Sequence, residues 1–351
     1  MTAARIGGNR NTPKPCTEPP YQEEAQGEGT RDTPVYHLFM DAAYEVGIKA
    51  VLITPARFLF NAGFTPKAWN EKMLADPHLT APIYVRDSSE LFPGTKIRAG
   101  IAVTYRDDSR VGVPIGTFTA YPELNTILHK VLESGAVSLE TLGITSSRSY
   151  RYTEKLYEDH PDARDMRPEG NAALVNTNTF EQFSFLYHVE EPRDDHKYVQ
   201  VLGVIKNKRL FRWIRSDYIS GPASFDKYKV AVPAANESKK LGQMAAPQVL
   251  GPQVGVTQTF LTLGAFETEA EAQACFAYVK TKLARAMLYV LKVTQHNPRS
   301  TWKFVPKQDF SSTSDIEWTK SIPEIDAQLC AKYGLDADEI RFVETEITPM
   351  D

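Results

Sequence analysis

Cysteine is scarce in this chain of 351 residues, and long apolar runs are missing from it. The three cysteines, Cys16, Cys275 and Cys330, are odd in number and far apart, which excludes a disulfide framework and a cysteine-based metal site. No apolar stretch approaches the ~20 residues that a membrane-spanning helix needs, and the N-terminal segment lacks the apolar core of a secretory signal. We therefore expect a cytoplasmic protein.

Positive charge is not in excess either, because 40 Lys and Arg residues face 44 Asp and Glu residues and the net charge is −4. Binding to nucleic acids depends on neutralising phosphates, so this balance by itself disfavours a DNA-binding protein. The acids, however, concentrate in residues 18–28 and 309–351, while Lys and Arg crowd the region between them. An acidic chain with a basic middle is compatible with a DNA-binding groove.

Residues 33–145 alternate between helix and strand patterns, as expected of an α/β domain. Thr33-Pro34 predicts a helix start, with an N-cap and a first-turn proline, and Gly47 predicts the end of that helix in a left-handed conformation. The apolar run from Ile48 to Ile53 then predicts a central, covered strand. Further predicted elements are a helix from Thr65-Pro66, a strand over Ile83–Val85, an antiparallel strand over Ile97–Tyr105 and a helix over Pro122–Glu133.

The pattern changes at Ser146, after which short β-prone runs separated by Pro, Gly and Asp clusters predict an irregular, β-rich α+β domain. One long helix is predicted next, opened by a Thr268/Glu271 capping box, and a second capping box at Ser321/Glu324 predicts another helix. The predicted strands are Phe183–Val189, Tyr198–Ile205, Leu210–Ile214, Lys227–Val232 and Phe260–Leu263.

A set of short motifs follows a definite order along the chain. The motifs are Pro19-Pro20-Tyr21, Tyr36–Asp41, Leu52–Phe60, Trp69–Met73, Phe92-Pro93, Ile97, Gly100, Thr301–Pro306 and Asp315–Trp318. In this order they resemble the N6-adenine-specific DNA methyltransferases of type II restriction–modification systems, including single-chain methylase/endonuclease proteins. The resemblance covers nearly all of the chain after residue 17.

The resemblance implies a domain organisation. Residues 1–32 would form a disordered or loop-like leader that contains the Pro-Pro-Tyr motif, and residues 33–145 the rear half of a Rossmann-like methyltransferase α/β sheet. Residues 146–310 would form an irregular α+β target-recognition domain that binds double-stranded DNA. Residues 311–351 would add C-terminal helices.

The resemblance assigns a catalytic loop to Glu18, Pro19, Pro20 and Tyr21. In the family this loop reads Asn-Pro-Pro-Tyr: the asparagine oxygen and the first proline carbonyl accept hydrogen bonds from the adenine amino group, and the tyrosine stacks on the flipped-out base. Here Glu18 stands in the asparagine's place. Glutamate is longer and carries a charge that is costly to bury, so we expect the exchange to affect catalysis.

The resemblance also implies S-adenosylmethionine as cofactor, bound by a strand and a glycine-rich loop upstream of the catalytic motif. In this chain Gly7-Gly8, Gly27–Gly29 and Gly251–Gly255 lack the strand–turn–helix context of such a loop. We therefore expect the chain to lack its own cofactor-binding motif. A second chain would supply that half, or the protein would act by binding alone.

Basic and aromatic residues interleave in the middle of the chain, in the predicted recognition domain. Lys and Arg there would hold DNA phosphates, and Asn207 or an arginine would read a base edge in the major groove. The polar face of the long helix, with Lys280, Lys282, Arg285 and Lys292, offers further contacts, whereas His296 is expected to be structural. The predicted DNA-binding residues are Arg148, Arg151, Lys206, Asn207, Lys208, Arg209, Arg212, Arg215 and Lys227.

The leading hypothesis is a DNA-binding restriction–modification protein related to adenine-N6 methyltransferases. One alternative is a non-enzymatic DNA-specificity subunit or an inactive remnant of such an enzyme. A second alternative is a magnesium-dependent nuclease that acts through Asp162, Asp195 and Lys197, because Tyr198 begins a predicted strand. The histidines show no spacing typical of zinc ligands.

Overall fold

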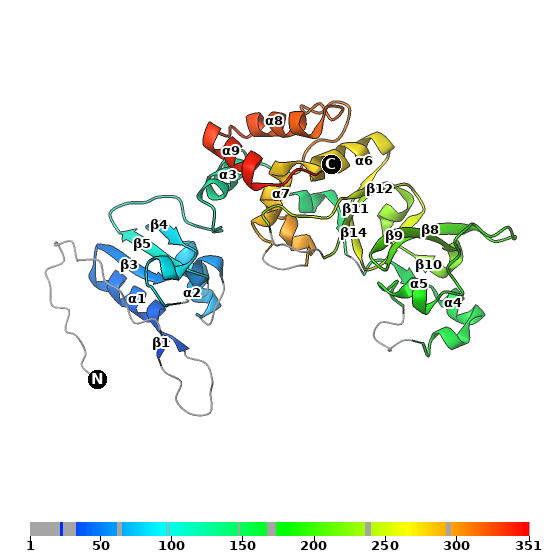
Figure 1. Cartoon of the computed structure of the whole chain (residues 1–351), viewed down its shortest axis with the longest axis horizontal. Coiled ribbons are helices and arrows are strands. Elements are labelled where there is room, and N and C mark those ends of the chain that lie inside the picture. The colour runs from blue at the N-terminus through cyan, green and yellow to red at the C-terminus, as the bar shows by residue number, and fades with distance from the viewer. Residues whose placement is uncertain are drawn as a thin grey trace. The chain divides into compact units, whose positions relative to one another are not determined.

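The computed structural model describes residues 22–23, 33–61, 65–95, 97, 99–146, 148–166, 173–235, 240–292 and 296–350. The chain divides into two compact units, Met1–Asn125 and Thr126–Asp351. Both are mixtures of helices and small sheets (Figure 1). The predicted domain boundaries stay predictions, although the short strand β6 (Ile144–Thr145) pairs with a strand of the second unit. Within the described ranges, no helix combines the length and the apolar character needed to cross a bilayer.

The first unit contains a three-stranded sheet with the order β3-β5-β4, formed by Lys49–Pro55, Ile101–Asp107 and Leu79–Val85. Strand β5 is antiparallel to both neighbours, so β3 and β4 run parallel to each other. They are joined through α2 (Lys67–Leu74), which makes a β–α–β connection (Figure 1). The antiparallel strand predicted near Ile97 is confirmed, but β5, not the apolar strand β3, is central among these three.

The start of the first helix differs from its prediction. Helix α1 spans Tyr36–Val46, and its N-cap residue Val35 makes no side-chain capping bond, because Thr33–Pro34 forms the short strand β2, which pairs with β1 (Gln22–Glu23). Gly47 ends the helix in an extended conformation, with φ −118° and ψ 131°, so the predicted left-handed cap is wrong. The backbone packs closely around position 47, where a Cβ atom would lie 3.2 Å from two carbonyl oxygens, and this explains the glycine.

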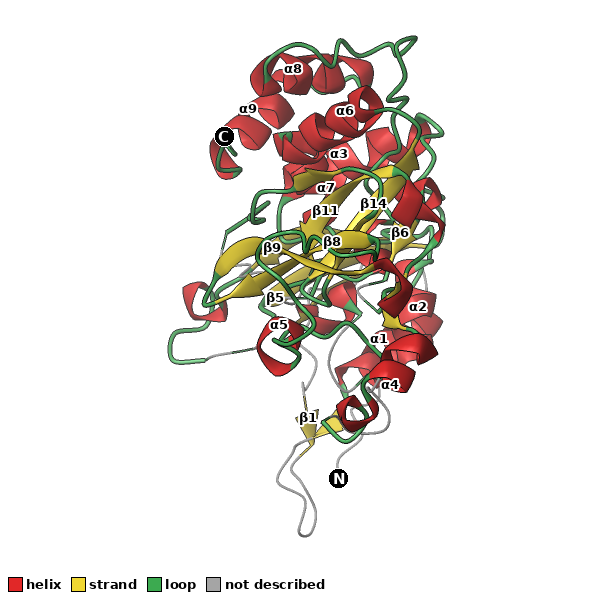
Figure 2. Cartoon of the chain, turned by 90° about the vertical axis from the view of Figure 1, so that its right-hand side faces the viewer, coloured by secondary structure: helices red, strands yellow, loops and turns green. Residues whose placement is uncertain are grey.

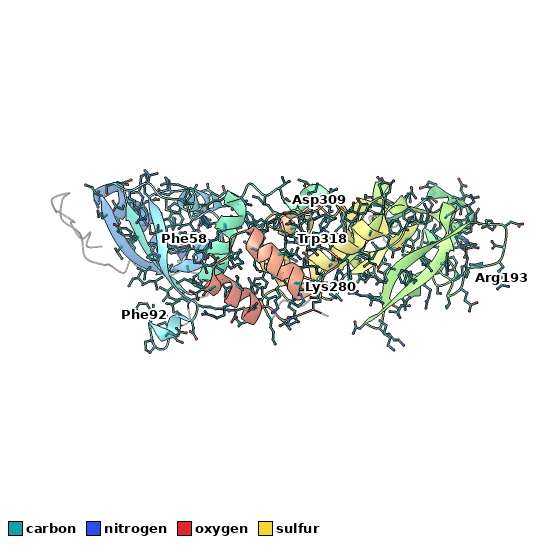
Figure 3. All side chains as sticks on the ribbon, turned by 90° about the horizontal axis from the view of Figure 1, so that it is seen from above. Phe58, Phe92, Arg193, Lys280, Asp309 and Trp318 are labelled. Atoms are coloured by element: carbon teal, nitrogen blue, oxygen red, sulfur yellow. The ribbon has the colours of Figure 1, made fainter. Side chains whose placement is uncertain are left out.

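An aromatic cluster joins the helices of the first unit to its sheet. The ring centroids of Tyr36, Phe58 and Trp69 lie 5.5 to 6.4 Å apart, and all three side chains are buried. Burying a side chain of this size contributes roughly 1.5–3 kcal/mol. The helix predicted from Thr65-Pro66 is α2, and its buried apolar residues are Trp69, Met73 and Leu74. Figure 3 shows Phe58 beside the sheet, and Phe92 on the connection between β4 and β5.

The second unit holds two larger sheets. One has the order β12-β11-β14-β6 and is antiparallel throughout; the other has the order β13-β8-β9, with β13 parallel to β8. A two-stranded ribbon joins β7 (Arg151–Tyr152) to β10 (Ile219–Ser220). The remaining bounds are Tyr198–Ile205 for β8, Lys208–Arg215 for β9, Tyr228–Pro233 for β11, Gln248–Leu250 for β12, Val254–Val256 for β13 and Phe260–Phe266 for β14.

Four of the five predicted strands are confirmed as β8, β9, β11 and β14. The fifth, Phe183–Val189, is wrong: it consists mostly of turns after the short helix α5 (Thr179–Gln182), with one bridge from His188 to Trp213. Its apolar residues Phe183, Leu186 and Tyr187 are buried in a core cluster, as are residues of α4 (Glu154–Asp159). The apolar run therefore reflects burial, not strand pairing.

The predicted long helix is two helices, α6 (Glu269–Lys280) and α7 (Lys282–Tyr289). The break lies at Thr281, whose ψ is 150° and whose hydroxyl accepts a hydrogen bond from the Ala284 backbone nitrogen. A hydroxyl that caps a new helix competes with continuation of the old one, while the apolar periodicity runs through both. The capping boxes at Thr268/Glu271 and Ser321/Glu324 are confirmed.

Helix α3 (Pro122–Glu133), as predicted, begins at the end of the first unit and continues into the second. The second unit also contains α8 (Ile322–Lys332) and α9 (Ala337–Glu346). Figure 2 shows α6 to α9 gathered on one side of strands β11 and β14. Gly135 follows α3 with φ +72°, the left-handed region that favours glycine.

Candidate nucleic-acid interface

The predicted catalytic loop, Glu18, Pro19, Pro20 and Tyr21, lies outside the described residues. The glycines of Gly7-Gly8 and Gly27–Gly29 lie outside them as well. Gly251 leads from β12 toward β13 and not into a helix. The catalytic loop and the cofactor motif stay predictions, and the candidate interface rests on the predicted DNA-binding residues of the second unit.

The tip of the β8–β9 hairpin presents basic and amide groups to solvent. Ile205 pairs with Lys208, so Lys206 and Asn207 form a two-residue turn, with φ 46° and 61°. Two positive φ values are typical of a type I′ hairpin turn, which asparagine favours and lysine rarely adopts. Lys206, Asn207 and Lys208 are exposed, and none forms an ion pair with a described residue. Two ammonium groups and an amide are thus free to contact a ligand.

Two arginines of β9 also lack a carboxylate partner among the described residues. The Arg209 guanidinium lies 5.4 Å from the centre of the Phe260 ring, and burial lowers the pKa of Arg209. Arg212 donates a hydrogen bond of 2.9 Å to the carbonyl of its neighbour Phe211. Both cations stay electrostatically available, since neither charge is compensated by an acid at hydrogen-bond distance.

Arg215 and Lys227 are placed differently, because each already contacts carboxylates. Arg215 Nη2 lies 2.6 Å from Asp217, Nη1 lies 3.2 Å from Asp159, and the hydrogen bond with Asp217 raises the pKa of Arg215. Lys227 Nζ lies 2.6 Å from Glu267. A phosphate would have to compete with these acids, so these two residues are weaker candidate ligands than the hairpin tip.

Arg148 lines a groove of about 800 Å³ in the second unit, whereas the exposed Arg151 belongs to the β7–β10 ribbon. The polar lining of the groove includes Thr145, Gln258, His296, Asn297 and Arg299. Sequence reasoning missed Asn297 and Arg299. His296, which was expected to be structural, forms a backbone bridge with Ala235 and is exposed at this groove. No local signal marks the groove, because it joins residues that lie about 150 positions apart in the chain.

The predicted DNA-facing side of the long helix is wrong for Arg285 and Lys292, which are each 3% exposed. The Arg285 guanidinium donates hydrogen bonds to four carbonyls, including those of Gly242 at 3.1 Å and Thr348 at 2.7 Å. Burial lowers the pKa of both side chains. Arg285 ties α7 to two loops, and this role is not visible in the helix pattern.

Residues 9–92 match the family model of the Eco57I restriction-modification methylase. This range includes the Pro-Pro-Tyr motif together with α1, β3, α2 and β4. The expected likeness to a restriction–modification methylase is thereby confirmed for this part of the chain. None of the curated proteins matches the chain.

The solved structures that are similar to this chain include two restriction enzymes. The type IIG restriction endonuclease BpuSI has 10% sequence identity and a TM-score of 0.33, covering 90% of this chain and 48% of that chain. The type IIL restriction-modification enzyme MmeI, in complex with DNA, has 8% identity and a TM-score of 0.34, covering 89% of this chain and 50% of that chain. The present chain thus spans about half the length of each.

The residues of the nuclease alternative lie on exposed segments. Asp162 belongs to a 3-10 turn, and Asp195 and Lys197 are exposed just before β8. The neighbouring Asp194 is the acid with partners here, because its carboxylate accepts hydrogen bonds from the His196 backbone and the Tyr198 hydroxyl. In the part of the chain that the structure describes, no group of three or more His, Cys, Asp or Glu side chains is placed to hold a metal ion.

Proposed function

We propose that this protein binds double-stranded DNA within a restriction–modification system and is related to the site-specific adenine-N6 methyltransferases. The match of residues 9–92 to the Eco57I restriction-modification methylase carries this proposal. The exposed cations at the hairpin tip support it, because the affinity of DNA-binding proteins comes largely from phosphate neutralisation.

In this proposal, Glu18, Pro19, Pro20 and Tyr21 line the pocket for an adenine turned out of the duplex. Glu18 puts a carboxylate where the family has an amide, and burying that charge beside the base costs free energy. The chain by itself therefore methylates DNA poorly or not at all. S-adenosylmethionine would be held by a segment or partner chain that carries the glycine-rich half of the site.

The DNA contacts divide by the partners that each residue already has. Lys206, Lys208, Arg209 and Arg212 act as the main phosphate ligands, since no carboxylate at hydrogen-bond distance compensates them among the described residues. Asn207, at the apex of the hairpin, is proposed to read a base edge. Arg148 and Arg151 add exposed charges, while Arg215 and Lys227 contribute less because Asp217, Asp159 and Glu267 bind them.

Fluorescence anisotropy of a labelled mixed-sequence duplex, titrated with the protein at several salt concentrations, tests the proposal. We expect binding at low salt that weakens steeply with salt, because each phosphate neutralised contributes about 0.9 to the slope of log K against log salt. The absence of binding at low salt would refute DNA binding by this chain.

The same preparation separates the alternatives. With S-adenosylmethionine added, a specificity subunit or an inactive remnant would bind the duplex without methylating it, and Glu18→Asn would restore methylation only if the rest of the site is intact. A nuclease would cut the duplex when magnesium or manganese is added. Methylation by the unchanged chain at normal turnover would refute the role given to Glu18.

A further inference from the structure

The groove that Arg148 lines is formed by segments far apart in the sequence. Its walls come from β6 and the loop after it, from Gln258 and Thr259 before β14, and from residues 296–299. A backbone hydrogen bond connects two walls of the groove. The backbone nitrogen of Asn297 donates this bond, of 2.8 Å, to the carbonyl of Ala234, which also lines the groove. The volume of about 800 Å³ falls in the range of roughly 300–1,000 Å³ that is typical of ligand pockets.

The charged side chains among the described lining residues of the groove are basic. Arg148 and Arg299 are exposed, and neither forms an ion pair with a described residue; Arg299 makes one long bond of 3.4 Å to the Glu140 carbonyl. His296 is exposed beside them, and none of the lining residues that the structure describes is Asp or Glu. Guanidinium groups bind phosphate oxygens through two parallel hydrogen bonds, so this lining favours a phosphate-bearing ligand.

A buried donor in the same wall lacks a partner. Asn297 is fully buried, and its side-chain oxygen accepts a hydrogen bond of 2.8 Å from the Thr301 hydroxyl. The amide nitrogen Nδ2 has no hydrogen-bond partner among the described residues. Leaving such a group unsatisfied costs about 1–3 kcal/mol. Nδ2 itself is buried, so the wall of the groove has to shift before an acceptor on a ligand can take this hydrogen bond. This donor is an observation independent of the two arginines.

We propose that this groove binds a nucleotide unit through its phosphate group, with Arg148 and Arg299 as phosphate ligands and Asn297 as a neutral donor. The first possible source of this phosphate is the backbone of a bound DNA strand, and for that source the inference rests on the proposed function. A free nucleotide offers the same chemistry and is the second source. The groove would then hold DNA on a surface separate from the β8–β9 hairpin tip.

The test compares Arg148→Gln/Arg299→Gln with Arg193→Gln/Lys307→Gln, which also removes two positive charges. Arg193 and Lys307 are exposed and do not line the groove, and Figure 3 shows Arg193 at the end of the second unit. Each protein is titrated with a labelled mixed-sequence duplex at several salt concentrations, and separately, by calorimetry, with deoxyadenosine monophosphate. We expect the groove variant to bind the duplex about tenfold more weakly at low salt, with a salt slope smaller by about two, and the control variant to change far less.

Each outcome has a definite meaning. Loss of duplex affinity in the groove variant alone establishes the DNA strand as ligand, whereas loss of nucleotide binding with unchanged duplex binding establishes the free nucleotide. If the unchanged protein binds the nucleotide but no duplex, and the groove variant loses nucleotide binding, the inference about the groove is supported and the proposed function is refuted. If the two variants behave alike with both probes, or the unchanged protein binds neither probe, the groove inference is refuted.

Discussion

The Oδ1 atom of Asp326, in α8, lies 3.0 Å from the backbone nitrogen of Leu283, in the first turn of α7. The Oδ2 atom accepts a second hydrogen bond, of 2.8 Å, from the backbone nitrogen of Lys282. A carboxylate from another helix thus satisfies two of the N–H groups that a helix start leaves unpaired. Thr281 satisfies a third, that of Ala284.

Asp326→Ala is expected to lower the free energy of unfolding of the second unit by about 1–3 kcal/mol, because two nearly buried backbone donors lose their acceptor. Urea unfolding followed by circular dichroism measures the change. Glu191→Ala, which removes an exposed acid, is the control and should stay within about 0.5 kcal/mol of the unchanged protein. Equal stability of the two variants would contradict the role of Asp326.

The buried Lys229 predicts a pH dependence of stability. Its ammonium donates to the carbonyls of Phe225, Lys227 and Gly251 at 2.9 to 3.1 Å, and burial lowers its pKa to about 8. Between pH 8 and the ordinary lysine pKa of 10.5, the unfolded chain therefore holds a proton that the folded chain has released. Stability due to this group rises with pH in that window, by about 1.4 kcal/mol per unit, and is lost as the pH falls toward 8.

Lys229→Met isolates this effect, since it removes the titrating group but keeps an extended side chain. Urea unfolding from pH 8 to 9.5 should show the unchanged protein gaining stability relative to Lys229→Met as the pH rises. The exposed Lys240, replaced by methionine, is the control and should leave the pH dependence unchanged. Parallel pH profiles for the unchanged protein and Lys229→Met would show that Lys229 stays charged throughout.

Duplex binding should depend on the hairpin tip more than on Arg215. Lys206→Gln/Lys208→Gln removes two free charges and is expected to reduce the salt slope by about two, while Arg215→Gln should change it by less than one unit. Asp159 and Asp217 already hold Arg215, so its loss should instead appear as a lower melting temperature. Anisotropy and thermal melting of both variants supply the two readouts. If Arg215→Gln reduced duplex binding more than Lys206→Gln/Lys208→Gln does, the prediction would be contradicted.

Asn297→Ala tests the neutral donor of the groove. One lost hydrogen bond of about 1 kcal/mol should weaken duplex binding about fivefold, and the salt slope should stay unchanged because the amide carries no charge. The double arginine variant, in contrast, is expected to reduce both the affinity and the salt slope. Gln273→Ala, on the exposed face of α6, controls for loss of an amide elsewhere. A change in slope in Asn297→Ala would indicate that the groove itself is distorted.

Several elements could be predicted from local sequence because their causes are local. The capping boxes of α6 and α8 each satisfy backbone groups within four residues, and the apolar spacing of α2 decides its buried face. Strands such as β8 follow β-branched runs bounded by turn residues. The basic character of the hairpin tip was also predicted from the sequence, whereas its type I′ turn was not.

Predictions failed where distant contacts decide the outcome. Thr33 was expected to cap α1 but belongs to the β2–β1 pair, and the helix that carries Arg285 was expected to face solvent on its polar side. The sequence pattern does not indicate that the buried Arg285 donates hydrogen bonds to the carbonyls of Gly242 and Thr348. A basic residue on a helix predicts a charge, but its neighbours decide whether that charge meets water.

The sequence by itself determined most of the helical and extended segments, the resemblance to restriction–modification methylases, and which residues carry positive charge in the middle of the chain. Tertiary structure alone decided the strand order β3-β5-β4, the compensation of Arg215 by Asp159 and Asp217, and the groove that joins Arg148 to Asn297 and Arg299. The physical reason is range: propensity and capping act over a few residues, whereas burial, ion pairing and cavities depend on side chains that only folding brings together.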